Sequence, residues 1–353
     1  MQLYAFAQHL AFAALLAAVS ALAVRGMIRW PILDDPARRA ATAHTRPTPK
    51  GGGVGVVLAF VLGMVVLYAQ ARFARLAGPQ FIGVILAAVA IAGVALADDI
   101  FDFRFLVKLG AQAGAAVVAV ASGLVLHRLS PPGLGPVELG WLGPVLTLVW
   151  ILGCTNAVNF MDGLDGLVGG ALFIACVALA VIGALLGGWF VYAAALFLAA
   201  GFVGFLPFNW HPARIFMGDV GSQFAGFILA VLAVAAAGFD AAQLSFLIVP
   251  LLIFGLLYDA AFTLARRALM HEPLATPHRT HLYQLAQRSG MPVRAVALAH
   301  WGFALFHAGL VALFLNLPAA QKGLAVLPAL AVQLGWTALV RRRMRRAGLA
   351  WRG

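Results

Sequence analysis

The sequence predicts an all-α, polytopic integral membrane protein with about eleven transmembrane helices, its N-terminus outside and its C-terminus in the cytoplasm. Of its 353 residues, 63% are hydrophobic and only 10% are charged. A soluble core cannot bury so large an apolar fraction. The apolar residues also fall into runs of about 20, the length that an α-helix needs to cross a bilayer.

The candidate spans follow one another along the chain. They are centred near residues 13, 61, 89, 116, 149, 177, 198, 230, 254, 304 and 330, and the runs near 149 and 198 give the weakest signals. The first run is similar to a secretory signal, because "ALA" at 21–23 resembles a cleavage site. However, no positive charge precedes it, and Arg25 and Arg29 follow it. This charge order predicts a retained first helix.

Lys and Arg are distributed unequally between the two sides of these spans. Counted in alternate loops from residue 25 onward, 20 of the 24 fall on one side, which the positive-inside rule places in the cytoplasm. The net charge of +12 therefore indicates anionic lipid headgroups and no nucleic acid. We divide the chain into a transmembrane domain, 1–340, with cytoplasmic active-site loops, and a basic cytoplasmic tail, 341–353.

The first acidic stretch, "VALADDIFDF", ends an apolar run with Asp98, Asp99 and Asp102. If the helix continues for one turn, the three carboxylates share a face. Carboxylates about 4 Å apart repel by about 4 kcal/mol at an effective dielectric constant near 20, so we expect a cation among them. The alternative is a helix end that carries solvated charges.

The second stretch, "NAVNFMDGLDG", places polar residues at every third position: Asn156, Asn159, Asp162 and Asp165. This spacing lines one side of a helical turn, and its glycines let the backbone approach a ligand closely. The stretch contains no Lys or Arg, so its counter-charge comes from a metal or another loop. Two Asx-Gly turns between helices are the simpler alternative.

The third stretch, "FNWHPARIFMGDVGS", separates two apolar runs. Asp219 begins the following helix, and Ser222 can cap it, so an ordinary N-cap is the alternative interpretation. Trp210 and Phe216 can offer a ring to a nucleobase, although aromatic side chains equally anchor membrane interfaces.

Two further segments can contact phosphate. "TPHRTHLYQ" carries His278, Arg279 and His281, with chance histidines in a solvated loop as the alternative. In "HTRPTPKGGG", Lys50 precedes three glycines at a helix start, which makes a candidate anion site, and a simple loop is the competing interpretation. Asp259, close to Arg266, either has a function or pairs with the nearby arginines.

The five segments are predicted to meet on one face of the membrane. Their carboxylates suit Mg²⁺ with a pyrophosphate substrate, because Mg²⁺ prefers oxygen ligands and binds through one or two carboxylates plus substrate phosphates. The sequence contains no zinc-binding set of His and Cys. Two anionic reactants also need charge neutralisation and positioning.

In this order, "RPTPKGGG", "DDIFDFRFLVKLGAQ", "NAVNFMDGLDGL", "FNWHPARIFMGDVGS" and the His-containing loop resemble one family. It is the polyprenyl-phosphate N-acetylhexosamine-1-phosphate transferases, glycosyltransferase family 4 in the phospho-MurNAc-pentapeptide translocase superfamily. The resemblance covers nearly the whole chain. It implies transfer of sugar 1-phosphate from a UDP-N-acetylhexosamine to undecaprenyl phosphate, with release of UMP.

The resemblance also implies Mg²⁺ as the cofactor, with Mn²⁺ as a substitute, and the lipid bilayer of the bacterial inner membrane as the setting. A homodimer is left open. In the family pattern, Asp219 corresponds to the Mg²⁺ ligand, and Asp98 and Asp99 activate the lipid phosphate. The remaining assignments are catalytic support by Asp162, pyrophosphate or sugar contacts by His278 and His281, and substrate binding by Lys50, Asn159, Asp165, Asn209, Phe216 and Arg279.

One departure bears on the subgroup. Where many members carry consecutive histidines or His-x-His-His, this chain reads "HRTHLYQ", so Tyr283 and Gln284 end the pattern. This favours the subgroup that initiates O-antigen or other surface polysaccharides over the phospho-MurNAc-pentapeptide translocase. A Mg²⁺-dependent membrane prenyltransferase also suits "DDIFD" but leaves Lys50 and "FMGDVGS" unexplained. A transporter predicts acids near mid-membrane and repeated halves, which we do not find.

Overall fold

The computed structural model describes residues 2–34, 47–70, 79–129, 135, 137–238, 244–274, 276 and 278–351. Within these residues nine helices are long and apolar enough to cross a membrane, which confirms the predicted all-α membrane fold. Some residues of the charge count lie outside the described ranges: Arg38, Arg39, Arg46, Arg72, Arg75 and Arg352.

The helices follow one another with short connections. The long ones are α1 (Gln2–Arg29), α2 (Gly53–Gln70), α3 (Pro79–Phe101), α4 (Phe105–Ala121), α5 (Leu142–Met161), α6 (Leu167–Leu186), α7 (Trp189–Asn209), α8 (Gly218–Gly238), α10 (Phe254–Leu269), α12 (Val293–Asn316) and α13 (Val326–Arg346). The short ones are α9 (Ile248–Leu252), α11 (Leu282–Arg288) and the 3₁₀ helix η2 (Ala319–Ala325). Two antiparallel hairpins pair β1 (Ile32–Asp34) with β2 (Thr48–Lys50), and β3 (Arg128–Leu129) with β4 (Val137–Glu138).

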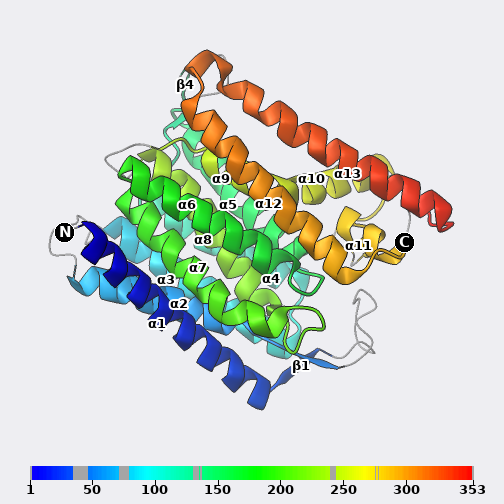
Figure 1. The fold of residues 1–353 in the computed structure, drawn as a ribbon, viewed down its shortest axis with the longest axis horizontal. Helices are drawn as coiled ribbons and strands as arrows, with labels where there is room; N and C mark the ends of the chain where they lie inside the picture. The colour runs from blue at the N-terminus through cyan, green and yellow to red at the C-terminus, as the bar shows by residue number, and fades with distance from the viewer. Residues whose placement is uncertain are drawn as a thin grey trace.

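Helix α8 lies inside the bundle, where it packs on α3, α5 and α2 (Figure 1). Its sequence, "GDVGSQFAGFILAVLAVAAAG", is rich in small residues, which allow helix backbones in a membrane to approach closely. A Cβ placed on Gly53 at the start of α2 would lie 2.2 Å from the Cα of Gly221. The three-glycine segment therefore lets α2 and α8 touch.

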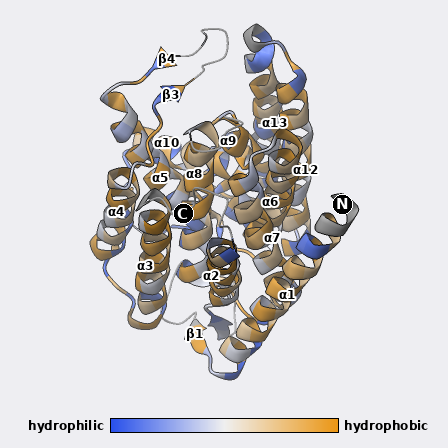
Figure 2. Cartoon of the chain, turned by 90° about the vertical axis from the view of Figure 1, so that its left-hand side faces the viewer, coloured by the Kyte–Doolittle hydropathy of each residue, from blue (hydrophilic) through white to orange (hydrophobic). Residues whose placement is uncertain are grey.

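Helices α12 and α13 run side by side along one edge of the molecule, joined by ring contacts such as Phe303 with Trp336 (Figure 1). The hairpin of β3 and β4 lies at the opposite end of the bundle from β1 (Figure 2). The long helices between these ends are mostly hydrophobic, as expected of helices that contact lipid (Figure 2).

Two predicted spans differ from the structure. The run near 254 is no continuous helix, because the backbone breaks at Ile253 between α9 and α10, and α10 buries the charged side chains of Asp259, Arg266 and Arg267. The run near 116 forms α4, which has 17 residues and is shorter than the nine long spans. The two weakest signals, near 149 and 198, are full-length helices, α5 and α7.

Candidate active site

Asp98 lies at the end of α3 and is almost completely buried, with 1% of its surface exposed. Its Oδ1 accepts a hydrogen bond of 2.7 Å from the amide of Phe103, and its Oδ2 lies 2.6 Å from Nζ of Lys108 on α4. Asp102 does not share this face: α3 stops before it, its φ is +54°, and it is exposed. The predicted cation is therefore present beside Asp98, whereas Asp102 lies exposed after α3 and lines the same cavity as Lys108.

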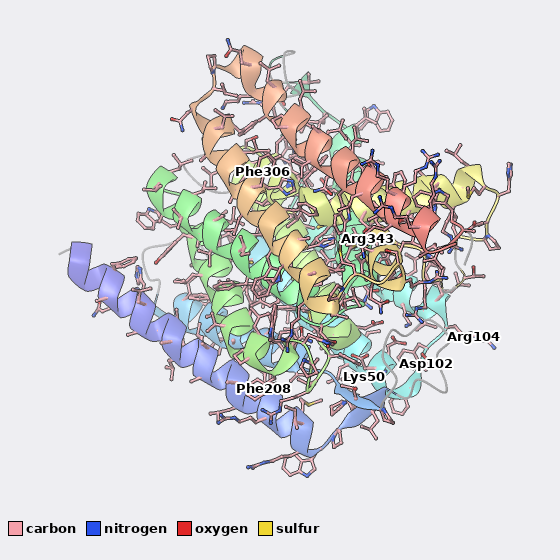
Figure 3. The ribbon with its side chains drawn as sticks, turned by 45° about the vertical axis from the view of Figure 1, so that its right-hand side comes forward. Lys50, Asp102, Arg104, Phe208, Phe306 and Arg343 are labelled. Atoms are coloured by element: carbon pink, nitrogen blue, oxygen red, sulfur yellow. The ribbon has the colours of Figure 1, made fainter. Side chains whose placement is uncertain are left out.

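Asp99 meets a second cation. Its Oδ1 lies 3.5 Å from Nζ of Lys50, and its Oδ2 accepts a hydrogen bond of 3.3 Å from the amide of Val220 on α8. Both side chains of the ion pair are buried, so few waters screen the attraction. Lys50, Asp102, Arg104 and Phe208 lie toward the same end of the bundle (Figure 3).

Asp219 stands in the first turn of α8, where three side chains donate to it. Asn159 Nδ2 lies 3.1 Å from Oδ1, while Lys108 Nζ and Gln223 Nε2 lie 3.3 and 3.2 Å from Oδ2. Lys108 thus links Asp219 to Asp98 across three helices. Ser222 does not cap α8, because its hydroxyl donates to the carbonyl of Gly218.

Asp162 directly follows the last residue of α5. Burial, together with the negative charges of Asp219, Asp99 and Asp165, raises its pKa to about 8. These four acids, from three separate segments, therefore lie close enough to influence one another.

Asp165 is held by hydrogen bonds from the loop that follows α7. Its Oδ2 lies 2.6 Å from Nδ1 of His211 and accepts a hydrogen bond of 3.0 Å from the amide of Ala213. Asn209 joins the same two loops: it accepts from the amide of Gly166 at 2.9 Å and donates to the carbonyl of Ile215 at 3.0 Å. The buried Asn209 amide thus holds the second and third stretches together.

Phe216 connects the third stretch to the first loop through its backbone. Its amide donates to the carbonyl of Pro49 at 2.8 Å, and its carbonyl accepts from Gly52 at 2.9 Å. Gly53 likewise donates to Met217. The predicted anion site at this helix start needs correction, because the amides of Gly52 and Gly53 already have protein acceptors.

The His-containing loop is anchored by Asp259. Its Oδ1 accepts from His281 Nδ1 at 3.2 Å and from the Leu282 amide at 2.9 Å, while Oδ2 accepts from the Tyr283 amide at 3.0 Å. Asp259 pairs with this loop, whereas the sequence left open a functional role or pairing with the nearby arginines. The rings of His278 and His281 stack with centroids 5.0 Å apart. Burial and nearby positive charges lower the pKa of His278 to about 4, so it is neutral at pH 7.

Tyr283 and Gln284, the residues that depart from the family pattern, both have structural contacts. The Tyr283 hydroxyl donates to the carbonyl of Phe160 at 3.1 Å, and Gln284 accepts from the amide of His281 at 3.2 Å. A Cβ on Gly163 would lie 2.2 Å from the Tyr283 hydroxyl, so the lack of a side chain at this glycine makes room for the tyrosine. The carbonyl of Arg279 accepts from Arg288 at 2.9 Å.

A cavity of about 1180 Å³ lies beside these groups. Its polar wall comes from α4, α5, α8, the residue after α3 and the segment 276–284: Asp102, Lys108, Gln112, Asn156, Asn159, Gln223, Thr276, His278, His281 and Gln284. Its apolar wall includes Val149, Trp150, Leu152, Leu257, Ala260, Ala261 and Leu264 from α5 and α10. The cavity can therefore accept a molecule with a charged end and a hydrocarbon end.

The oxygen-rich donor set suits a hard divalent cation. Two carboxylates, Asp98 and Asp219, already approach one cationic group, the ammonium of Lys108. No group of three or more His, Cys, Asp or Glu residues in the described ranges could hold an ion by itself. Mg²⁺ does not need such a group when substrate phosphates complete its ligands.

Cys154 and Cys176 are buried and unpaired, as expected of packing residues.

Comparison with known proteins assigns the family. A model of glycosyl transferase family 4 matches residues 81–237. A probable undecaprenyl-phosphate N-acetylglucosaminyl 1-phosphate transferase of Bacillus subtilis is 31% identical over 284 residues, which cover 79% of this chain and 76% of that protein. The chain belongs to glycosyl transferase family 4. The matched residues run from α3 to α8 and so include the helices that carry Asp98, Lys108 and Asp219.

Two further relatives of this family 4 chain are informative. A decaprenyl-phosphate N-acetylglucosaminephosphotransferase of Mycobacterium tuberculosis is 33% identical over 285 residues, or 74% of this chain and 70% of that protein. A phospho-N-acetylmuramoyl-pentapeptide-transferase of Moorella thermoacetica is 41% identical over 132 residues, only 36% of this chain and 42% of that protein.

Sequence reasoning missed several residues of the site: Lys108, Gln112, His211 and Gln223. Lys108 and Gln112 had a usable signal, because polar side chains in apolar membrane helices are costly and usually functional. His211 had no such signal, because nothing in the spacing of the sequence connects it to Asp165.

Proposed function

We propose that this protein transfers N-acetylhexosamine 1-phosphate from a UDP-sugar to undecaprenyl phosphate, releasing UMP. The observation that carries the proposal is the bridge of Lys108 between Asp98 and Asp219, at the wall of a cavity that is polar on one side and apolar on the other. A lipid phosphate has the same two-part character. The names of the relatives, which describe polyprenyl-phosphate acceptors, support this substrate class.

The proposed reaction exchanges one phosphorus–oxygen bond for another. A bond forms between an oxygen of the lipid phosphate and the β-phosphorus of the UDP-sugar, and the bond from that phosphorus to the bridging oxygen breaks. UMP leaves with the bridging oxygen, and the sugar stays on its phosphate. Because both reactants are anions, charge neutralisation and positioning supply most of the catalysis.

The chain's own residues divide this work. Lys108 neutralises the carboxylates of Asp98 and Asp219, and its ammonium also lines the cavity, where it can contact a phosphate. Asp99, held by Lys50 and a backbone amide, is assigned to accept the proton of a monoprotonated lipid phosphate. Asp219 would hold Mg²⁺, or Mn²⁺ in its place, and the bound ion would supply charge neutralisation at the pyrophosphate.

The UDP-sugar is proposed to contact the other predicted residues. Asn159, His278 and His281 line the cavity directly, so they can reach the pyrophosphate or the sugar. Asp165, Asn209 and Phe216 hold the neighbouring loops in place through the contacts described above, and these loops would shape the uridine end. Arg279 is proposed to contribute its guanidinium to phosphate binding.

We further propose that the product initiates surface polysaccharide of the O-antigen type, and that the site faces the cytoplasm at the inner membrane. The relatives that cover about three quarters of the chain are named N-acetylglucosamine 1-phosphate transferases, whereas the pentapeptide-transferase match covers about one third. This difference in coverage, together with Tyr283 and Gln284, favours UDP-GlcNAc or a related sugar over the peptidoglycan precursor.

Radiolabelled UDP-sugars test the proposal. Purified protein with undecaprenyl phosphate and Mg²⁺ should move label from UDP-GlcNAc, or from another member of a UDP-N-acetylhexosamine panel, into butanol-extractable lipid, with one UMP per lipid. Asp99→Asn should stop transfer while UDP-sugar binding persists. Transfer from no UDP-sugar, combined with prenylation of an aromatic acceptor, would contradict the proposal and favour a membrane prenyltransferase.

A further inference from the structure

Three amide side chains form a continuous hydrogen-bonded row that ends on Asp219. Asn156 Nδ2 on α5 lies 2.6 Å from Gln112 Oε1 on α4. Gln112 Nε2 lies 3.1 Å from Gln223 Oε1 on α8, and Gln223 Nε2 lies 3.2 Å from Asp219 Oδ2. Gln112 and Gln223 are each 3% exposed. The row therefore crosses the interface of three membrane helices.

Chemistry fixes the direction of every amide in the row. An ionised carboxylate only accepts hydrogen bonds, so Gln223 must turn its NH₂ group toward Asp219 and its oxygen toward Gln112. Gln112 must then present its NH₂ group to Gln223 and its oxygen to Asn156. Asn156 completes the row by donating to Gln112 and, at 2.8 Å, to the carbonyl of Leu152. A change at one amide is therefore transmitted to the next.

We propose that Asn156, Gln112 and Gln223 are positioning residues for Asp219. The row presents a fixed N–H group to Oδ2 and so sets the rotation of the carboxylate. Lys108 Nζ also contacts Oδ2, at 3.3 Å, and Asn159 Nδ2 donates to the other oxygen, Oδ1, at 3.1 Å. The inference rests on the proposed function, in which Asp219 binds the divalent cation. Partners of this kind, one step removed from the ion, commonly change metal affinity by about 10- to 100-fold.

Simple helix adhesion is the competing explanation, because buried amides also join membrane helices. The two explanations predict different results. If the row only joins helices, substitutions in it should lower the thermal stability of the protein and leave its affinity for the ion unchanged. If the row positions Asp219, the same substitutions should weaken the affinity for the ion. A row that acts in series also makes the effects of its members non-additive.

Binding of Mn²⁺ to the full-length protein in detergent with a fixed concentration of UDP, followed by the electron paramagnetic resonance signal of free Mn²⁺ and compared with UDP alone, distinguishes them. Gln223→Met should raise the dissociation constant of Mn²⁺ about tenfold, and Gln112→Met several-fold. The double variant should match Gln223→Met alone, because removal of Gln223 already disconnects the row. Gln333→Met, a change at an amide on α13 that is 1% exposed and outside the row, is the matched control and should bind Mn²⁺ like the wild type.

Thermal melting without metal checks that each variant is folded, and Asn156→Leu gives the same test from the far end of the row if Gln112→Met aggregates. Wild-type affinity in Gln112→Met or Asn156→Leu, or additive effects in the double variant, would overturn the inference. A wild type without saturable Mn²⁺ binding would overturn it as well. A wild type that binds Mn²⁺ but forms no UMP contradicts only the proposed transferase function.

Discussion

Lys108 is the residue on which the geometry of the site depends. Its ammonium approaches Asp98 at 2.6 Å and Asp219 at 3.3 Å, and it is one of the cavity-lining side chains. Two buried carboxylates without a nearby cation would carry a large desolvation and repulsion cost. Lys108 offsets part of that cost by approaching both carboxylates at once.

Asp219→Asn tests the assignment of the ion ligand. The neutral amide keeps the size of the side chain but removes the negative charge, so we expect turnover to fall at least a thousandfold, equivalent to about 4 kcal/mol of transition-state stabilisation. Raising Mg²⁺ should restore part of the rate. Initial rates of UMP release over a Mg²⁺ series measure both effects, and near-normal turnover in this variant would show that Asp219 is not the ligand.

For single residues, the sequence predicted that the acidic side chains need a cationic partner, but it did not predict which residues contact one another. The expected cation among Asp98 and Asp99 is confirmed, because repulsion between carboxylates in an apolar setting follows from residue types alone. The exposure of Asp102 was not predictable, since it depends on where α3 stops. The pairing of Asp165 with His211 depends on two loops that only the tertiary fold brings together.

Among the elements, α2 packs closely against the first turns of α8, the helix that carries Asp219. Gly53→Ala should separate these helices, because the added Cβ would lie 2.2 Å from Gly221 Cα. We expect a loss of stability of about 1–3 kcal/mol together with reduced turnover. Gly114→Ala, at a site with nothing within 4 Å of the new Cβ, is the control and should stabilise slightly or be neutral. Melting temperatures in detergent that are equal for both variants would contradict this close contact.

The break between α9 and α10 brings Asp259 to the His-containing loop. Asp259→Asn should fold but lose about 10- to 100-fold in turnover, because its NH₂ group would face backbone and histidine donors and turn His281 away. Thr263→Val, which removes only the 3.2 Å hydroxyl contact to Asp259, should have a smaller effect. Turnover rates of both variants with saturating substrates test this prediction. Full activity of Asp259→Asn would show that Asp259 does not hold the His-containing loop for catalysis.

Hydropathy located most helices but not this break. The apolar run near 254 has the composition of a span. After the interruption at Ile253, α10 carries Asp259, which contacts His281, 22 residues further along the chain. Sequence patterns predict elements from local periodicity, so an interruption imposed by tertiary contacts has no local signal.

At the scale of the whole molecule, segments from the first loop to the C-terminal residues gather at one end. Trp351, near the C-terminus, joins these segments through two contacts with Arg266. Its carbonyl accepts a hydrogen bond from Arg266 at 3.2 Å, and its ring lies under the same guanidinium. Arg266 in turn donates to Thr280 of the His-containing loop. Helix α13 continues to Arg346, so it includes the first six residues of the predicted tail.

The sidedness of this end can be measured with single cysteines. Arg342→Cys, at the basic end of α13, should react with a membrane-impermeant maleimide only after permeabilisation, because the positive-inside rule places it in the cytoplasm. Glu138→Cys, on the exposed hairpin at the other end, should react in intact cells. The two native cysteines are buried and should give little background. The reverse labelling pattern would place the active site outside.

Anomalous diffraction from Mn²⁺ in crystals grown with UDP tests the central claim most directly. The acidic segments at the end of α3, after α5 and at the start of α8 are expected to surround one divalent ion. The anomalous difference map should show a single strong peak within coordination distance of the Asp219 carboxylate, beside Asp98 and Lys108. A peak elsewhere in the molecule, or none at saturating Mn²⁺ and UDP, would contradict this claim.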